Sequence, residues 1–202
     1  DDRLSRGLGD VYKRQELPNL GETLKNYFNP NLRLIRDMPK PVVAAVNGAA
    51  AGAGANIALA CDIVLAARSA KFLQAFARIG LIPDAGGSWS LPRLVGPARA
   101  RGLAMLAEPI GAETAEEWGL IWKAVNDDSL MAEARETAMK LANGPTLGLA
   151  LTKQAMLAAA TNSLEEQLLL EEQVQARAGA SDDYREGVSA FLEKRPAKFS
   201  GR

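Results

Sequence analysis

Histidine is absent from the 202 residues, and cysteine occurs once, as Cys61. Without histidine the chain cannot form the Ser–His or Cys–His pairs of common nucleophilic enzymes, and one cysteine argues against a zinc site. A general acid or base must therefore be Asp, Glu, Lys, Tyr or Cys. A single cysteine also excludes an internal disulfide and fits a reducing compartment. We therefore expect a cytoplasmic protein with no resident metal.

The chain also lacks an excess of charge and a long apolar run. Its 24 Lys and Arg residues balance 24 Asp and Glu residues, which leaves no electrostatic basis for binding nucleic acid or an anionic membrane. No apolar run reaches the roughly 20 residues that a membrane-spanning helix needs. A hydrophobic content of 48% suits a globular chain with one sizeable core. We therefore expect a small-molecule substrate, with neither nucleic acid nor membrane as a partner.

The patterns of apolar residues divide the chain into three parts. Residues 1–15 have no regular period, and we predict that they are disordered or foreign to the fold. Residues 16–127 contain the predicted strands, with helices between them, and are expected to form an α/β core. Residues 128–202 are expected to be helical, and Ser163 with Glu166 forms a capping box at one of their helix starts.

A glycine-rich turn follows the first predicted strand, residues 42–46. Gly52 and Gly54 flank Ala53, where a helix-forming segment begins. A strand, a glycine turn and a helix start together direct unpaired backbone N–H groups at an anion or a polarised oxygen. A dinucleotide site is disfavoured because the third glycine and the acidic residue after the next strand are missing. Alternatively, the small residues only let a helix pack close to a strand, and the pattern leaves both interpretations open.

Asp84 lies in a second glycine-rich turn, LIPDAGG, and also has two interpretations. Asp is a favoured N-cap, and a helix is expected to follow at residues 86–94. A carboxylate opposite an N–H trap is, however, what enolate chemistry requires. Asn56, one turn into the helix that starts at Ala53, is either a substrate contact or an exposed helix residue. Lys194, near the end of the chain, either contacts a phosphate or belongs to a solvated tail.

Four segments closely resemble the crotonase (enoyl-CoA hydratase/isomerase) superfamily, from about Leu17 to the end of the chain. They are KPVVAAVNGAAAGAGANIALACDIVLAARSAKF, GLIPDAGGSWSLPRLVG, EWGLI and DDYREGVSAFLEKRPAKF. The resemblance implies a spiral of ββα turns with a helical C-terminal region that forms homotrimers or hexamers. It also implies an acyl-CoA substrate, with no cofactor beyond the CoA of that substrate. Within the superfamily, GAGAN, IPDAGGSW and SDDYREGVSAFLEKR are most similar to isomerases of phenylacetate breakdown.

The resemblance also assigns roles to individual residues. The backbone N–H of Ala53 matches one of two donors that hold the thioester oxygen, with Gly52 and Gly54 beside it. The other donor belongs to a C-A-G-x-D-L type of segment expected before residue 16, so we expect the chain to be N-terminally truncated. Asp84 matches the carboxylate of isomerases, which would open an epoxide to an oxepin or shift a double bond.

Further substrate-binding positions come from the same resemblance. Asn56 and Phe76 match the two glutamates with which hydratases activate water, and neither side chain can transfer a proton. Phe191 and Lys194 would border the CoA site of a neighbouring subunit. Two other hypotheses remain open: a general enoyl-CoA hydratase/isomerase of fatty-acid type, and an inactive truncated chain that only binds CoA or partner subunits.

Overall fold

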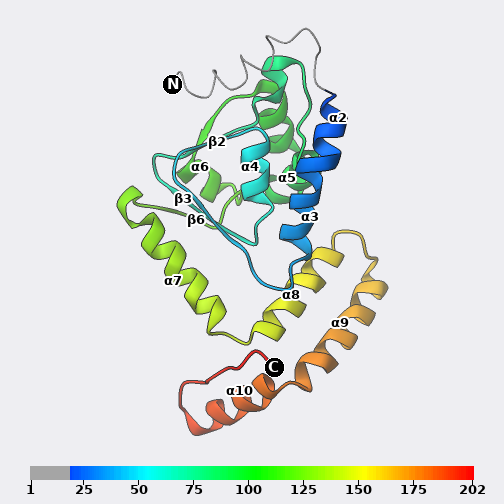
Figure 1. Cartoon of the computed structure of the whole chain (residues 1–202), viewed down its shortest axis with the longest axis vertical. Coiled ribbons are helices and arrows are strands. Elements are labelled where there is room, and N and C mark those ends of the chain that lie inside the picture. Colours follow the sequence, from blue (N-terminus) through cyan, green and yellow to red (C-terminus); the bar gives the residue numbers. More distant parts are fainter. Residues whose placement is uncertain (1–18) are drawn as a thin grey trace.

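The computed structural model describes residues 19–202, and its core is built on two three-stranded sheets (Figure 1). The first is parallel, in the order β1-β3-β6, and is formed by β1 (Val43–Val46), β3 (Ile63–Ala67) and β6 (Lys123–Val125). The second, in the order β2-β4-β5, is formed by β2 (Ala49–Ala51), β4 (Lys71–Leu73) and β5 (Ile110–Gly111). Strand β4 is parallel to β2 and antiparallel to β5.

The chain passes from the first sheet to the second in the same way twice. Strand β1 leads to β2 and then to a helix, and β3 leads to β4 and then to further helical segments. Each pair of strands is in register with its counterpart: Val46 lies opposite Ala66 in the first sheet, and Ala50 lies opposite Phe72 in the second. This repeat is the ββα spiral that the resemblance implied, and the α/β fold class is confirmed.

Helices surround the sheets and then continue beyond them. They are α2 (Leu20–Thr23), α3 (Asn29–Asp37), α4 (Ala53–Leu59), α5 (Gly87–Leu106), α6 (Ala112–Glu117), α7 (Leu130–Ala142), α8 (Thr146–Ala158), α9 (Leu164–Gly179) and α10 (Asp182–Glu193). A π-helical turn, η1 (Leu24–Phe28), joins α2 to α3, and a 3-10 helix, η2 (Ala75–Ile79), follows β4. In Figure 1 the C-terminal helices α8, α9 and α10 extend away from the end of the molecule that holds α4 and β2.

Small residues let the core elements approach one another closely. Ala66 in β3, Ala55 in α4, and Ala112 and Ala115 in α6 have no exposed surface. Larger apolar side chains, among them Leu65, pack into the same cluster. The alanine-rich sequence thus has a packing function as well as any role at the turn. Protein interiors are close-packed, so a change of even one methylene group in the core alters the packing.

Side-chain caps fix the helices of the C-terminal region. The predicted capping box is confirmed: Ser163 Oγ accepts the Glu166 N–H, and the Glu166 carboxylate accepts the Ser163 N–H. At the start of α10, Ser181 Oγ accepts the Tyr184 N–H, without a return bond from a side chain. The buried Asp183 carboxylate accepts the N–H groups of the terminal segment, at 2.6 Å from Ser200 N. The last residues of the chain are therefore fastened to α10.

Several predictions concern segments or divisions that residues 19–202 do not test. The proposed foreign or disordered segment 1–15 and the second thioester donor before residue 16 lie outside the described residues. The division into 16–127 and 128–202 remains a prediction. Within residues 19–202, no helix is long and apolar enough to cross a bilayer. The same residues contain no group of three or more His, Cys, Asp or Glu side chains arranged to hold a metal ion.

Candidate active site

The turn before α4 can be formed only by glycine. Gly52 has φ 55° and ψ −128°, a backbone conformation that residues with a side chain rarely adopt. A Cβ atom at this position would lie 3.6 Å from the Phe76 ring, and the Gly52 N–H donates to the Leu73 carbonyl at 2.8 Å. The next residue, Ala53, is the first of α4, so its N–H has no acceptor one turn earlier in the helix. That N–H is therefore available to an external acceptor.

The second position of α4 leaves open space next to this N–H. Gly54 is exposed, and apart from its chain neighbours and the backbone of its own helix no described residue comes within 4 Å of a Cβ atom built on it. A substrate can approach the backbone here without displacing a side chain. The backbone of this turn is accessible, so the binding interpretation stays open beside the packing one.

Asp84 opens a strained turn. The Gly87 N–H donates to the Asp84 carbonyl at 2.8 Å, and both central residues have positive φ, 45° at Ala85 and 77° at Gly86. This is the backbone pattern of a type I′ turn, in which glycine or asparagine is usual. Ala85 is 4% exposed and carries a side chain in the left-handed region, a strain that typically costs about 1–3 kcal/mol. Surrounding contacts must therefore hold the turn in place.

The capping interpretation of Asp84 is wrong. The N-cap of α5 is Gly86, and no side chain caps that helix start in the described structure. The reason is the type I′ turn, which places two residues between Asp84 and the helix. The Asp84 Oδ1 atom is buried and has no hydrogen-bond partner among the described residues. Burial raises the pKa of the Asp84 carboxyl, and its own backbone N–H lowers that pKa to a smaller extent.

Asn56 is buried, so its interpretation as an exposed helix residue is wrong. It is 1% exposed, donates from Nδ2 to the Asp84 carbonyl at 2.8 Å and accepts at Oδ1 from Gln74 Nε2 at 2.9 Å. The contact with Asp84 joins the first turn of α4 to the turn that carries the carboxylate. Gln74 was missed in the sequence, because a single glutamine after a short strand carries no periodic or motif signal.

The remaining predicted site residues lie in two separate parts of the molecule. Phe76, 6% exposed, packs against Gly52 and so belongs with Asn56 and Asp84. Phe191 is 83% exposed on α10, and Lys194 follows that helix in an exposed position. Figure 1 places α10 at the opposite end of the molecule from α4. Within one chain, Phe191 and Lys194 are therefore not brought to the Asp84 turn.

A small cavity of about 290 Å³ adjoins the Asp84 turn. It is lined by Leu32, Arg36, Asn56, Ala60, Ala85, Gly86, Trp89 and Ser90. The Trp89 ring contacts two guanidinium groups, Arg36 at 4.4 Å and Arg93 at 4.1 Å from the ring centroid. Leu32, Ala60, Ala85 and Trp89 form its apolar and aromatic walls, and Arg36, Asn56 and Ser90 supply polar groups, a mixture that is usual in pockets for small molecules.

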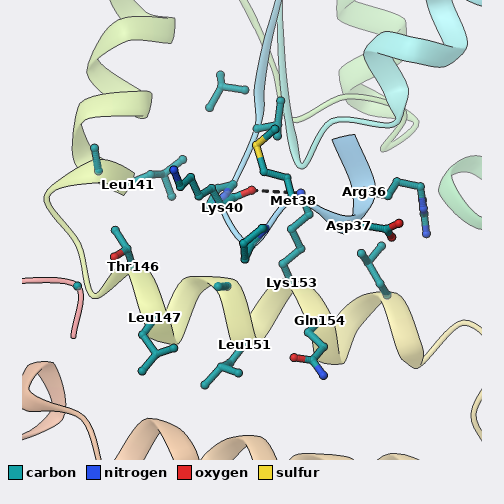
Figure 2. Close-up of a pocket in the computed structure, with 18 of the residues that line it drawn as sticks. Arg36, Asp37, Met38, Lys40, Leu141, Thr146, Leu147, Leu151, Lys153 and Gln154 are labelled. Carbon is teal, nitrogen blue, oxygen red and sulfur yellow. Dashed lines mark hydrogen bonds between the residues drawn. The ribbon is translucent and has the colours of Figure 1, made fainter. Parts of the chain in front are cut away.

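A larger cavity of about 1080 Å³ lies elsewhere, where α8 faces the segment between α3 and β1 (Figure 2). Its buried cation, Lys153, donates to the Ile35 carbonyl at 2.7 Å, the Lys40 carbonyl at 3.2 Å and the Asp62 carboxylate at 2.7 Å. These three bonds use all three ammonium hydrogens. Lys153 is therefore a structural link between α8 and the core.

Comparisons with known proteins agree with this geometry. Residues 7–202 match the family model described as enoyl-CoA hydratase/isomerase. The solved structure of an enoyl-CoA hydratase from Polaromonas sp. JS666 superposes with a TM-score of 0.86 at 35% identity, over 96% of this chain and 75% of that one. The chain belongs to the enoyl-CoA hydratase/isomerase family.

Two relatives are similar to this chain over more than half their sequences. It is 55% identical over 185 residues to the 1,2-epoxyphenylacetyl-CoA isomerase of Escherichia coli K12, covering 92% of this chain and 71% of that protein. It is 56% identical over 184 residues to a Rhodobacter capsulatus protein described as "Probable enoyl-CoA hydratase", covering 91% and 72%. Since the two names differ in reaction and the identities are nearly equal, the chemistry of the site must decide between them.

Proposed function

We propose that this protein isomerises an acyl-CoA thioester, with 1,2-epoxyphenylacetyl-CoA as substrate and the oxepin isomer as product. The proposal depends on the Asp84 carboxyl group, which has a buried oxygen with no hydrogen-bond partner among residues 19–202 and a pKa raised by burial. Its turn is joined to the helix that offers the Ala53 N–H. One group can move a proton and the other can accept negative charge on an oxygen, which together suit enolate chemistry.

The proposed mechanism uses both groups in turn. The Ala53 N–H donates to the thioester oxygen while Asp84 takes a proton from the carbon next to the thioester carbonyl. The electron pair moves onto the thioester oxygen. The ring carbon–carbon bond that the epoxide shares then breaks, which widens the six-membered ring to the seven-membered oxepin, and the proton returns to a ring carbon as the thioester carbonyl re-forms, so that no atom is gained or lost. Gly52 and Gly54 let the thioester approach the backbone. The reaction needs no metal and no cofactor beyond the CoA of the substrate.

Water addition is the less suitable reaction for this site. A hydratase must hold and activate a water molecule, which needs groups that can transfer a proton. Asn56 has its amide oxygen and one amide hydrogen engaged by Gln74 and Asp84, and Phe76 presents only an aromatic ring. These two residues distinguish the proposal from a general enoyl-CoA hydratase of fatty-acid type.

The proposal is tested by assaying the purified full-length protein with two substrates. We expect conversion of 1,2-epoxyphenylacetyl-CoA, and hydration of crotonyl-CoA slower by at least about 10²-fold, the smallest usual contribution of positioned proton transfer. Faster hydration than isomerisation would establish the fatty-acid type instead. Binding of both thioesters without turnover of either would establish an inactive CoA-binding protein.

We further propose that the protein assembles as a homotrimer or a hexamer in the cytoplasm. The helices α8 to α10 expose large apolar side chains, among them Met156, Leu168, Leu169, Phe191 and Leu192. Apolar surface gathered in this way usually marks a partner surface. In such an assembly Phe191 and Lys194 of one subunit would border the CoA site of its neighbour. We expect analytical ultracentrifugation of the full-length protein to show trimers or larger species at micromolar concentration, and a purely monomeric protein would contradict the proposal.

A further inference from the structure

The Asp84 turn is held by a backbone hydrogen bond of its own and by one side chain from α4. The Asp84 carbonyl accepts two hydrogen bonds, from the Gly87 N–H and from Asn56 Nδ2, each at 2.8 Å. The first closes the turn on itself, and the second fastens the turn to α4. A strained conformation persists only when its surroundings fix it. Asn56 supplies such a contact 28 residues earlier in the chain.

The fit between Asn56 and the turn leaves no spare room. A Cβ atom built on Gly87 would lie 2.2 Å from Asn56 Nδ2, a distance that real Cβ atoms do not reach. Glycine at position 87 therefore permits the close approach of the amide to the turn. Since Asn56 is 1% exposed, its hydrogen bonds are shielded from water.

Gln74 sets the direction in which the Asn56 amide points. Gln74 Nε2 donates to Asn56 Oδ1 at 2.9 Å, so the amide oxygen is occupied and the amide nitrogen faces the Asp84 carbonyl. Gln74 is 3% exposed, and its own Oε1 has no partner among the described residues. A buried acceptor without a partner is unfavourable for folding, so this atom opposes the stability that the bond to Asn56 provides.

We propose that Asn56 and Gln74 are positioning residues that fix the distance between Asp84 and the Ala53 N–H. Asn56 lies one helical turn after Ala53, so a single rigid segment carries both the proposed thioester donor and the contact to the Asp84 turn. Gln74 orients the amide, and Asn56 places the turn. The inference rests on the proposed function, because it assigns what positions the proposed base.

The experiment compares three neutral replacements in the full-length protein. Asn56→Leu keeps the branched shape and removes the donor to Asp84, and Gln74→Met keeps the unbranched shape and removes the donor to Asn56. Asn162→Leu is the matched control, since Asn162 Nδ2 also bonds a glutamine, Gln167, at 3.0 Å but in the C-terminal region. We expect Asn56→Leu to lower kcat by about 10–100-fold with KM within about threefold, because a misplacement near 1 Å can cost 10²-fold. Gln74→Met should lower kcat by less, and Asn162→Leu should leave it unchanged.

A double variant separates positioning from general damage. In an Asp84→Asn background, Asn56→Leu should lower the residual kcat no further, because the residue acts only through the carboxylate. A multiplied loss, or a kcat of Asn56→Leu equal to that of the control, would overturn the inference. If Asn56→Leu does not fold, Gln74→Met decides, and a wild-type kcat there overturns it too. An active Asp84→Asn variant would instead overturn the proposed role of Asp84, so the two failures are distinguishable.

Discussion

Replacing Asp84 with Asn should lower the isomerase activity of the full-length protein by about 10²–10⁴-fold, the usual contribution of a positioned proton-transfer group. Asn keeps the shape and polarity of the side chain and removes only its ability to take up a proton. These 202 residues contain no histidine, so none of them can supply an imidazole in its place. Binding of the CoA thioester should persist. The measurements are turnover of 1,2-epoxyphenylacetyl-CoA and the affinity for a CoA ester.

The same replacement should leave the melting temperature unchanged or raise it. Burial raises the pKa of Asp84, so the ionised carboxylate is less favourable in the folded protein than in the unfolded chain. The folded state therefore loses stability from this group as pH rises from the ordinary aspartate range through the raised pKa. Near neutral pH, Asn removes that unfavourable charge. Unchanged turnover at unchanged melting temperature would leave the proposed mechanism without its base.

The pH dependence of activity should carry the signature of the same carboxyl group. Asp84 acts as a base only when ionised, so kcat/KM should fall as pH drops through its pKa. Because burial raises that pKa, the fall should occur at a higher pH than for an exposed aspartate. In Asp84→Asn the residual activity should lose this acid limb. An unaltered limb in the variant would assign it to another group.

The elements that carry local signals could be predicted from the sequence. Glycine at position 52 before an alanine-rich segment indicated the start of α4, and the Ser163 capping box indicated the start of α9. Apolar runs indicated β1 and β3, which are paired in parallel in the first sheet. In each case the sequence pattern and the helix or strand that it predicts involve residues close together in the chain, so local preferences are enough to predict the element.

The support of the site could not be predicted in this way. The bond from Asn56 to Asp84 joins residues 28 apart, and the bond from Gln74 to Asn56 joins residues 18 apart. The left-handed conformation of Ala85 could not be predicted either. Alanine normally avoids positive φ, and only tertiary contacts hold it there. This unforeseen turn, which moves the helix start away from Asp84, is why the capping interpretation was wrong.

Replacing Gly54 with Val should reduce turnover while the fold remains stable. Valine has a higher helix propensity than glycine, and no described residue beyond the neighbouring backbone of α4 lies within 4 Å of the new Cβ position, so the helix can accept it. The added side chain stands beside the Ala53 N–H and should keep the thioester oxygen from reaching it. Loss of one such donor typically lowers kcat by about 10²–10³-fold.

A graded series and a matched control make this expectation specific. Gly54→Ala adds one methyl group and should lower turnover less than Gly54→Val, because less bulk stands in the path of the thioester. Gly102→Val is the control: Gly102 lies inside helix α5, and beyond the neighbouring backbone of that helix no described atom lies within 4 Å of its Cβ position. It should leave turnover at the wild-type level. Turnover near wild type in Gly54→Val would show that the thioester does not bind at the Ala53 N–H. A thioester bound there would clash with the branched side chain next to that donor.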